Sequence, residues 1–456
     1  MSGLRLDSLI CFAALSGCAA TAGSSSYGRL DTEFSRSEPA PSGARATSDA
    51  TTERELSAGT LERSAFVRAV LRRNPTIESA RLGWRAAIAR VHQAGPLEDP
   101  MVDVGLAPLS IGSSRAPFGY EVAISQKLPW FGKRALEASA AAAEAQAARS
   151  DFESTRRELA LTAIVLYDQY FVAVRSLAIN AQHVELMRAV RGGAVAQFES
   201  GRGSAQDPLQ AESELARLER DQAMLGAARD VVTAQMNELL HRAPGDPLAP
   251  PPAELSLPDM DARDEASSAE RAVSSRPDVR AMRQRAEAQQ ARADRAGRDA
   301  YPDVTVSTSY NSMWEMPEHR WMVGLGFNVP IQTGARTGAA DEAAAMRRQF
   351  ETDATRLEAA ARTQVFMTEK QLGESRTVLR LFEQRLLPAA KDQIDAARAG
   401  FTASRNPFMA VIEAERNLRS LELDYQMARA ECDRRHAELE RALGKIPGLG
   451  AEGDVR

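Results

Sequence analysis

The sequence predicts a mainly α-helical protein with a small membrane β component, in which duplicated long-helix hairpins carry four β-strands per chain. Three observations predict this fold class. Motifs recur at a nearly constant offset, residues 130–207 contain no proline, and four short segments alternate apolar with small or polar residues. The first observation indicates a tandem repeat, the second long helices, and the third strands.

The duplication is visible as matching residues in the two halves of the chain. Residues of the first copy recur 202 or 203 residues later, and one proline recurs 201 residues later. The matched pairs are Pro75 and Pro277, Pro100 and Pro302, Pro129 and Pro330, Gly132 and Gly334, Phe198 and Phe401, and Leu215 and Leu418. This spacing predicts repeats over 59–242 and 263–446, a proline-rich linker over 243–262 and a C-terminal tail over 447–456.

The proline-free segment is rich in Ala, Glu, Arg, Gln and Leu, which favour helix. A helix from about Lys133 to Gln197 would be about 98 Å long at 1.5 Å per residue. The second copy predicts a corresponding helix from Gly334 to Leu387, ended by Pro388, and shorter helices such as Leu61–Gln93 and Leu209–Leu240 flank the long ones. Helices of this length are typical of coiled coils or tubular walls.

Strands are predicted at about 101–109 and 118–128 in the first copy, and at about 303–314 and 320–329 in the second. In the first strand, Val102, Val104 and Leu106 alternate with Asp103 and Gly105. Each strand is close to the length that a tilted strand needs to cross a bilayer. Four strands are too few to close a membrane barrel, and an open edge leaves backbone groups unpaired in lipid. The sequence therefore predicts a barrel shared between subunits, of unspecified number.

Only 5% of the residues are aromatic, yet aromatic side chains cluster at the strand ends. Trp130 and Tyr301 fall at one level, and Trp314 and Trp321 at the other, as expected of an interfacial girdle. The outer loop between the third and fourth strands also contains Met313, Met316 and His319, which could bind a soft metal ion; the alternative is an apolar loop beside the girdle.

The N-terminus has the features of an export signal. A short apolar run leads to Leu15-Ser16-Gly17-Cys18, which resembles a bacterial lipobox, so residues 1–17 are a predicted signal peptide and Cys18 the lipidated residue. An ordinary signal peptide is the alternative. Residues 18–58 are rich in Ser, Thr, Ala and Gly and are interpreted as a lipidated tether. Cys432 is then interpreted as a buried apolar residue.

Both repeats, from about Ala58 to Gly444, resemble the outer-membrane factors typified by TolC, and in particular the CusC-like and CzcC-like lipoprotein branch. The resemblance is most specific in the duplicated strand pairs and in the segment from Ile124 to Lys133, ISQKLPWFGK. It implies a homotrimer with a 12-stranded barrel and a periplasmic helical tunnel. It further implies a passive exit duct in the outer membrane of a Gram-negative bacterium, fed by a periplasmic adaptor and an inner-membrane RND-type transporter, with heavy-metal cations as one substrate class.

The resemblance also places the periplasmic gate and tip residues. In the first copy Phe198, Gly201 and Asp207 match the family spacing, with Gly201, Arg202 and Gly203 forming the turn. The second copy departs from it, because Ser404, Arg405 and Ala410 occupy the corresponding region. Glu413 matches the second family acid. We expect Glu413 from three subunits to form an acidic constriction that favours cations; an exposed carboxylate at a helix end is the alternative.

The composition narrows the function further. A net charge of -5 gives no basic footprint for nucleic acid, and no stretch approaches the length of a membrane-spanning helix. The five histidines are scattered, and no nucleophile, phosphate-loop or dinucleotide motif is present. We therefore expect no enzymatic activity and no cofactor. A periplasmic adaptor and a lipid-anchored coiled-coil scaffold remain the alternatives to a duct.

Overall fold

The computed structural model describes residues 21–36, 52–57, 59–112, 114, 117–255, 265–403 and 405–449. The chain divides into two compact units. The first comprises Ala80–Phe152, Asp278–Leu357 and the described residues before Glu38; the second comprises the described residues of Pro39–Ser79, with Glu153–Pro277 and Glu358–Arg456 as far as residue 449. Each unit draws on both predicted repeats.

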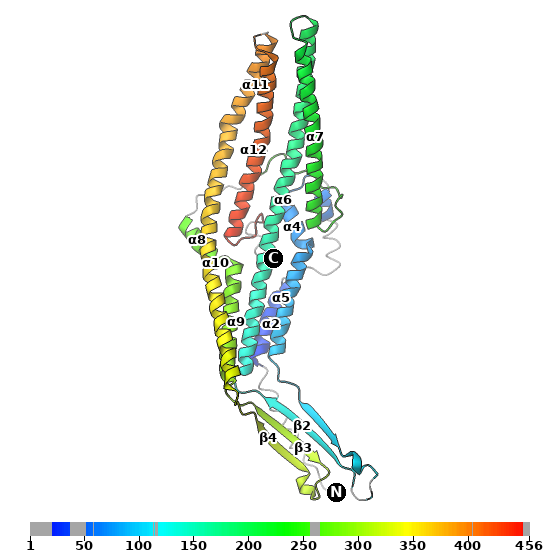
Figure 1. Cartoon of the computed structure of the whole chain (residues 1–456), viewed down its shortest axis with the longest axis vertical. Helices are drawn as coiled ribbons and strands as arrows, with labels where there is room; N and C mark the ends of the chain where they lie inside the picture. The colour runs from blue at the N-terminus through cyan, green and yellow to red at the C-terminus, as the bar shows by residue number, and fades with distance from the viewer. Residues whose placement is uncertain are drawn as a thin grey trace. The chain divides into compact units, whose positions relative to one another are not determined.

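A four-stranded antiparallel sheet forms one part of the first unit (Figure 1). Its strands are β1 (Met101–Leu106), β2 (Tyr120–Leu128), β3 (Val304–Asn311) and β4 (Trp321–Phe327), in the order β1-β2-β3-β4. All four predicted strands are therefore present. The central pair joins the two repeats, with Glu121 opposite Asn311 and Leu128 opposite Val304.

All four strands are shorter than their predicted segments, and each hairpin loop contains a 3-10 turn. The turn η1 (Pro108–Ser110) follows β1, and η2 (Pro317–His319) precedes β4. Proline has no N–H to donate to a strand ladder and fits the first turn of a helix, so Pro108 ends the extended backbone after β1.

Helices of the first unit include α2 (Thr21–Arg36), most of α5 (Pro75–Ala94), α9 (Pro277–Arg298) and the first parts of α6 (Lys133–Glu199) and α10 (Thr333–Leu381). Part of the predicted tether is thus helical and packed. Phe34 of α2 is buried and its ring lies 5.1 Å from that of Trp84 on α5, in an edge-to-face arrangement. Cys18 lies outside the described residues.

The second unit consists of helices around an apolar core. It contains α4 (Arg63–Arg73), the rest of α6 and α10, α7 (Gln206–Leu239), α8 (Glu265–Ser275), α11 (Leu387–Thr402) and α12 (Phe408–Ala442). The main cluster includes the fully buried Phe66, Ile164, Tyr167 and Met236. Cys432 is buried in a separate apolar cluster, as its interpretation required.

The sequence expectation that no segment is apolar enough to span a bilayer needs one correction. A window of α6 reaches a mean hydropathy of 1.2, which would suffice by length and composition. Half of that window is buried inside the chain. Since the core helix of a folded protein has the same property, this is weak evidence for a membrane span.

Two predicted helix boundaries were wrong. The helix predicted from Leu61 to Gln93 is interrupted at Asn74, which is extended because Pro75 follows it. Conversely, Pro388 does not end the long helix of the second repeat, since α11 continues beyond it after the π-helical turn Phe382–Leu386 (η3). Proline would clash with the carbonyl four residues earlier in a regular α-helix, here that of Gln384, and the wider π turn accommodates it.

Candidate functional site

The strand registers collect the apolar side chains on one face of the sheet, called here the apolar face. Across the sheet, Val104 lies opposite Val122, Val122 opposite Tyr310, and Tyr310 opposite Trp321. The apolar face comprises Val102, Val104, Leu106, Tyr120, Val122, Ile124, Leu128, Val304, Val306, Tyr310, Trp321, Val323, Leu325 and Phe327, with Gln126 and Thr308 as its polar members. Val104 is 64% exposed and Val323 80% exposed. A surface of this kind is typical of contact with lipid or with another chain.

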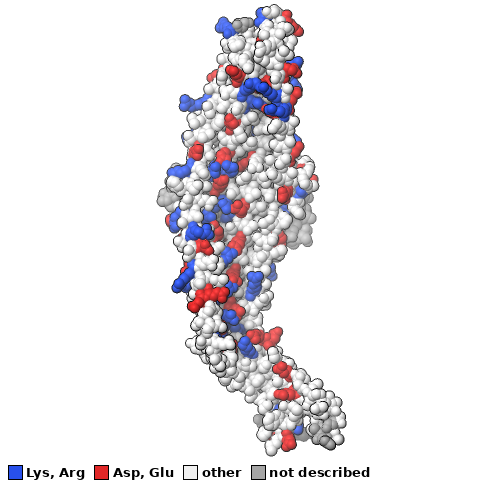
Figure 2. All heavy atoms as spheres, viewed as in Figure 1, with Lys and Arg blue, Asp and Glu red and all other residues white. Residues whose placement is uncertain are grey.

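The opposite face is small and polar. It carries Met101, Asp103, Gly105, Glu121, Ala123, Ser125, Lys127, Thr305, Ser307, Ser309, Asn311, Met322, Gly324 and Gly326. In the view of Figure 2, charged side chains of both signs are spread over the helices, whereas the surface at the sheet is mostly uncharged. An apolar and a polar face on one sheet are what a strand between lipid and a water-filled lumen requires.

Both edges of the sheet are open within the described part of the chain. The strand order places β1 at one edge and β4 at the other. Their side chains are exposed along almost their whole length. An exposed edge presents unpaired N–H and C=O groups that can pair with another strand.

The four aromatic residues predicted for the girdle lie at the strand ends. Trp130, which follows β2, stacks on Tyr301, which precedes β3, with ring centroids 5.4 Å apart. Trp321, at the start of β4, packs edge-to-face on Tyr310 at 5.3 Å. Trp314 lies in the loop before β4 and packs edge-to-face on His319. The two pairs therefore lie at opposite ends of β3.

The soft-ligand loop is exposed. Met313 and Met316 are both more than half exposed, and the ring of His319 contacts Trp314. Met313 approaches Gly119, where a Cβ atom would lie only 2.8 Å from its Cγ. The side chain of Met313 thus lies against the segment before β2, and His319 lies against Trp314 of its own loop.

A polar node at one end of the sheet joins the two repeats. The ammonium of Lys133 lies 2.8 Å from Asp303 Oδ1 and 3.3 Å from Asp299 Oδ1, and it donates to the carbonyl of Tyr301 at 3.1 Å. The same Asp303 oxygen accepts the backbone N–H of Trp130 at 2.9 Å. The Lys133 side chain is only 7% exposed. Sequence reasoning noted Lys133 only as part of a motif, because its acidic partners lie more than 160 residues away.

The first helical turn, between α6 and α7, is closed by glycine. Gly201 has a φ of +73°, which disfavours a side chain, and the N–H groups of Arg202 and Gly203 both donate to the carbonyl of Gln197 at 2.9 and 3.0 Å. These bonds satisfy the end of α6 in the manner of a Schellman motif. The three residues predicted for the turn therefore do form it.

Asp207 acts locally at the start of α7. Its Oδ2 accepts the N–H of Ser204 at 3.3 Å, and its own N–H donates to the carbonyl of Ser204 at 3.1 Å. This reciprocal pair satisfies the helix start. Phe198 and Leu209 are exposed beside the turn, so this end of the hairpin carries apolar surface.

The second turn, between α11 and α12, is built differently. The N–H groups of Arg405 and Asn406 donate to the carbonyl of Gly400 at 2.7 and 3.2 Å, and a Cβ atom at Gly400 would collide with the Asn406 side chain. Phe401 packs edge-to-face on Phe408 at 5.2 Å across the turn. Ser404 lies outside the described residues. Gly400 and Asn406 were missed because the repeat pairs Gly201 with Ser404.

Glu413 is exposed on the first turns of α12. The guanidinium of Arg416, one turn further on, interacts electrostatically with the carboxylate of Glu413 and also forms an ion pair with Glu214 of α7. The structure brings Glu413 close to a positive charge within the chain, and it does not bring it together with Asp207 in a described contact.

A buried polar cluster links α6 to α12. His183 Nδ1 lies 2.7 Å from Glu415 Oε1, and His183 Nε2 lies 2.9 Å from Glu422 Oε2. Burial alone would lower the pKa of His183, but the hydrogen bonds to the two carboxylates outweigh it and raise the pKa to about 9. The imidazolium is therefore the stable form at neutral pH. Sequence reasoning treated this histidine as isolated, since both partners are more than 230 residues away.

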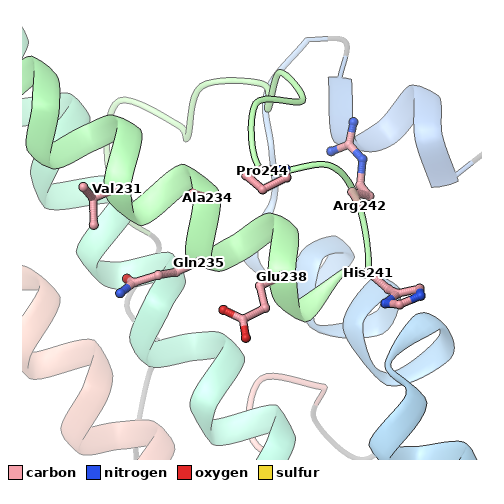
Figure 3. A pocket seen from close by; sticks show the side chains of 7 residues that line it. All are labelled: Val231, Ala234, Gln235, Glu238, His241, Arg242 and Pro244. Carbon is pink, nitrogen blue, oxygen red and sulfur yellow. The ribbon is translucent and has the colours of Figure 1, made fainter.

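An open hollow of about 470 Å³ lies beside the last turns of α7 and the following loop. Figure 3 shows the side chains that line it. Its lining includes Glu238, His241 and Arg242, and Arg242 is paired with Glu53 at 2.6 Å. No group of three or more His, Cys, Asp or Glu residues suited to a metal ion occurs in the described residues. The sheet and the helical turns are therefore the stronger functional candidates.

Solved structures of similar fold are outer-membrane channels. CusC superposes with a TM-score of 0.72 at 15% identity, covering 86% of this chain and 94% of that one. VceC from Vibrio cholerae gives 0.69 at 16% identity, with 85% and 96% covered. CmeC from Campylobacter jejuni gives 0.70 at 13% identity, with 86% and 87% covered. At these identities the likeness establishes the fold, which spans both repeats.

A sequence profile of a protein family also matches part of the chain. The profile described as outer membrane efflux protein matches residues 269–445, which correspond to the second repeat. No curated protein matches the sequence. The second repeat thus resembles the outer membrane efflux protein family, and the chain shares the fold of the CusC and VceC structures over most of its length.

Proposed function

We propose that this protein is the outer-membrane channel of a tripartite efflux system, a passive duct assembled as a homotrimer. The observation that carries the proposal is the four-stranded sheet, with one exposed apolar face, one small and polar face and two open edges. Three copies would supply twelve strands, enough to close a barrel with no edge in lipid. The polar face would then line the water-filled lumen.

The proposed partners are those of the family that the second repeat resembles. In such a system an inner-membrane transporter of the RND type supplies the energy and a periplasmic adaptor contacts the helical turns of the channel. The exposed Phe198 and Leu209 at the first turn offer apolar surface for that contact. The outer membrane of a Gram-negative bacterium is the proposed location.

Heavy-metal cations are the proposed substrate class, on the resemblance of the segment from Ile124 to Lys133 to metal-efflux members. The node at Lys133 limits what this segment contributes. Because the Lys133 side chain is buried against Asp299 and Asp303, it serves the junction between repeats and is not available to a passing ion. Small organic substrates are the competing class, and efflux phenotypes decide between them.

The direction of α2 supports a lipid anchor at Cys18. Tyr27 contacts His92 near the end of α5, whereas Phe34 contacts Trp84, two turns earlier on α5. The two helices are therefore antiparallel, and α2 begins at the end of α5 that leads into β1. A lipidated Cys18 would lie three residues before α2, within reach of the membrane that holds the sheet. Replacing Cys18 with Ser should abolish incorporation of labelled palmitate.

Single-channel recording tests the duct directly. The purified protein in planar bilayers should give stable ohmic conductance, and unheated samples should migrate on SDS gels as an assembled species that heating dissociates. A deletion strain should become sensitive to metal salts if cations are the cargo. Absence of conductance together with only monomeric protein would favour the adaptor or scaffold alternatives.

Glu413 makes a specific prediction within this function. Glu413→Gln should reduce the cation-to-anion permeability ratio by about twofold or more, because an acidic ring stabilises cations at a constriction. The matched control is Glu219→Gln on α7, an equally exposed glutamate that the ring does not include. Equal selectivity in both variants and the parent would place the constriction elsewhere. The nearby Arg416 predicts that Arg416→Gln shifts selectivity toward cations.

A further inference from the structure

The pairing of β2 with β3 within the chain is called here the inner seam, and the pairing between neighbouring copies is called the seam between copies. If the duct assembles as proposed, the inner seam is a template for the seam between copies. In the inner seam the second strand of repeat 1 pairs with the first strand of repeat 2, from Glu121 opposite Asn311 to Leu128 opposite Val304. Closing the sheet requires the second strand of repeat 2, β4, to pair with the first strand of repeat 1, β1, in the next copy. Each of the two pairings thus joins the second strand of one repeat to the first strand of another.

Prolines flank the corresponding strands in both repeats, and they relate the register of the β2–β3 pair to that of the proposed β4–β1 pair. Pro100 and Pro302 lead into β1 and β3, and Pro129 and Pro330 follow β2 and β4, so β3 maps onto β1 and β2 onto β4. The pair of Leu128 with Val304 becomes Val329 with Val102. The next four pairs become Asn328 with Asp103, Phe327 with Val104, Gly326 with Gly105, and Leu325 with Leu106.

The translated register matches both faces of the sheet. Phe327 and Leu325 meet Val104 and Leu106 on the apolar face, and Gly326 meets Gly105 on the other. Val329 lies two residues beyond the end of β4 and meets Val102 if β4 is extended in the same alternation. All six apolar side chains are exposed in the single chain. A slip of one residue would oppose apolar to polar positions, so it is disfavoured.

A slip of two residues preserves the faces and needs a separate argument. The two hairpins themselves differ by such a step, since Val102 faces Ile124 in the first, whereas its counterpart Val304 faces Phe327 in the second and not Leu325. Applying that step would place Val329 opposite Val104. For twelve strands it implies a strand tilt of about 54°, against about 46° for the anchored register, and membrane barrels tilt by about 35–45°. The tilt therefore disfavours this slip. The opposite slip, with Phe327 opposite Val102, implies a tilt of about 35°, so the tilt does not disfavour it, and there the anchored register rests on the positions of the prolines.

We propose that β4 of one copy pairs antiparallel with β1 of the next copy with Val329 opposite Val102, Phe327 opposite Val104 and Leu325 opposite Leu106. The seam between copies differs in chemistry from the seam within the chain. Lys133 and Asp303, which lock the inner seam, correspond to Ala335 and Met101 at the outer one. The seam between copies is therefore held by backbone pairing and apolar contact, without a matching ion pair.

Cysteine cross-linking tests the register. Directly opposed residues have Cβ atoms about 4.5–5.5 Å apart and diagonal ones about 7–8 Å apart, whereas a disulfide needs about 3.5–4.5 Å. After mild oxidation in outer-membrane vesicles, V102C/V329C and V104C/F327C should each give covalent dimers and trimers on non-reducing gels. The matched controls are V104C/V329C and V102C/F327C, which report the two-residue slips in the two directions, and V102C/L325C, which lies four residues out of register.

The outcomes separate the register from the duct. Strong cross-linking of V104C/V329C, with V102C/V329C weak and conductance intact, would overturn the register and leave the function standing. Single-cysteine variants should give no trimers, and buried Cys432 serves as the common background. If no pair cross-links and no variant or parent conducts, the proposed assembly itself is wrong. Heat-modified mobility confirms that each variant is inserted before its cross-linking is scored.

Discussion

Two buried aspartates of the second unit differ in their partners. Asp433 of α12 is fully buried and forms an ion pair with Arg63 of α4. Asp168 of α6 is also buried, but no ion pair of its carboxylate occurs among the described residues; the carboxyl oxygens of both aspartates lack hydrogen bonds there. Burial, the largest influence, raises the pKa of Asp168 to about 8, although the charges of Arg63 and Arg434 act in the opposite direction. Asp168 is therefore mostly protonated at neutral pH.

These partners predict opposite responses to amide substitution. A carboxyl whose folded pKa is raised loses its contribution to stability as pH rises through that pKa, here between about pH 4 and pH 8. Asp168→Asn should thus raise the free energy of unfolding at pH 8.5 by about 1 kcal/mol or more. Asp433→Asn should lower it by about 3 kcal/mol, because it leaves Arg63 without its buried partner.

Urea-induced unfolding of the detergent-solubilised protein at pH 6 and pH 8.5 measures both effects. The parent should lose stability between these pH values, and Asp168→Asn should lose less of it. An Asp168→Asn protein with the same pH dependence as the parent would show that this carboxyl is ionised in the folded state.

At the scale of elements, α2 shows how far the sequence could be read. Tyr27, Leu30 and Phe34 lie on one helical face, but Gly28 and the preceding serines weaken the periodicity, and the segment was interpreted as a tether. The contact that orders it lies outside the segment. Phe34 packs on Trp84 with the guanidinium groups of Arg81 and Arg85 about 5 Å from its ring. Such a partner is invisible to local reasoning.

Docking of α2 depends on this aromatic contact. Phe34→Ala should raise the rate of tryptic cleavage within α2 by about tenfold or more, because local opening no longer breaks the buried ring contact. Arg29→Ala, on the exposed side of the same helix, is the control and should leave cleavage at the remaining sites unchanged. Mass spectrometry of the fragments locates the cuts. Equal rates for both variants would show that the helix is held by other contacts.

The sequence predicts where the strands lie and which of their side chains share a face. Of their pairings, it predicts the hairpins but not the pairing between repeats. Alternation of Val102, Val104 and Leu106 identified β1, and the hairpin with β2 follows from short separation. The β2–β3 pairing joins residues about 180 positions apart, and no local pattern in the sequence predicts it. The same limit hid the partners of His183 and Lys133, because a side chain's type and spacing carry no information about a distant helix or strand.

On the scale of the whole molecule, two similar repeats perform unequal tasks. One pairing between repeats, β2 with β3, lies within the chain, and the proposed second, β4 with β1, lies between copies. The inner seam carries the buried ion pairs of Lys133, whose counterpart Ala335 has no charge. Because β2 and β3 belong to one chain, their pairing is already favoured. The ion pair of Lys133 makes this pairing more specific. Assembly then draws on apolar surface that stays exposed until copies meet.

This division predicts a strong energetic coupling between Lys133 and Asp303. A double-mutant cycle with Lys133→Ala and Asp303→Ala should give a coupling free energy of about 1–3 kcal/mol, since the pair is 2.8 Å apart and mostly buried. The matched cycle on the exposed pair Arg356 and Asp353 should give at most about 0.5 kcal/mol. Unfolding in urea supplies the free energies, and heat-modified mobility reports assembly.

Because the seam between copies lacks this pair, raising the salt concentration should weaken the first coupling only slightly and leave the fraction of assembled trimer unchanged. Dissociation of the trimer by salt alone would show that charged contacts between copies, and not apolar ones, hold the seam.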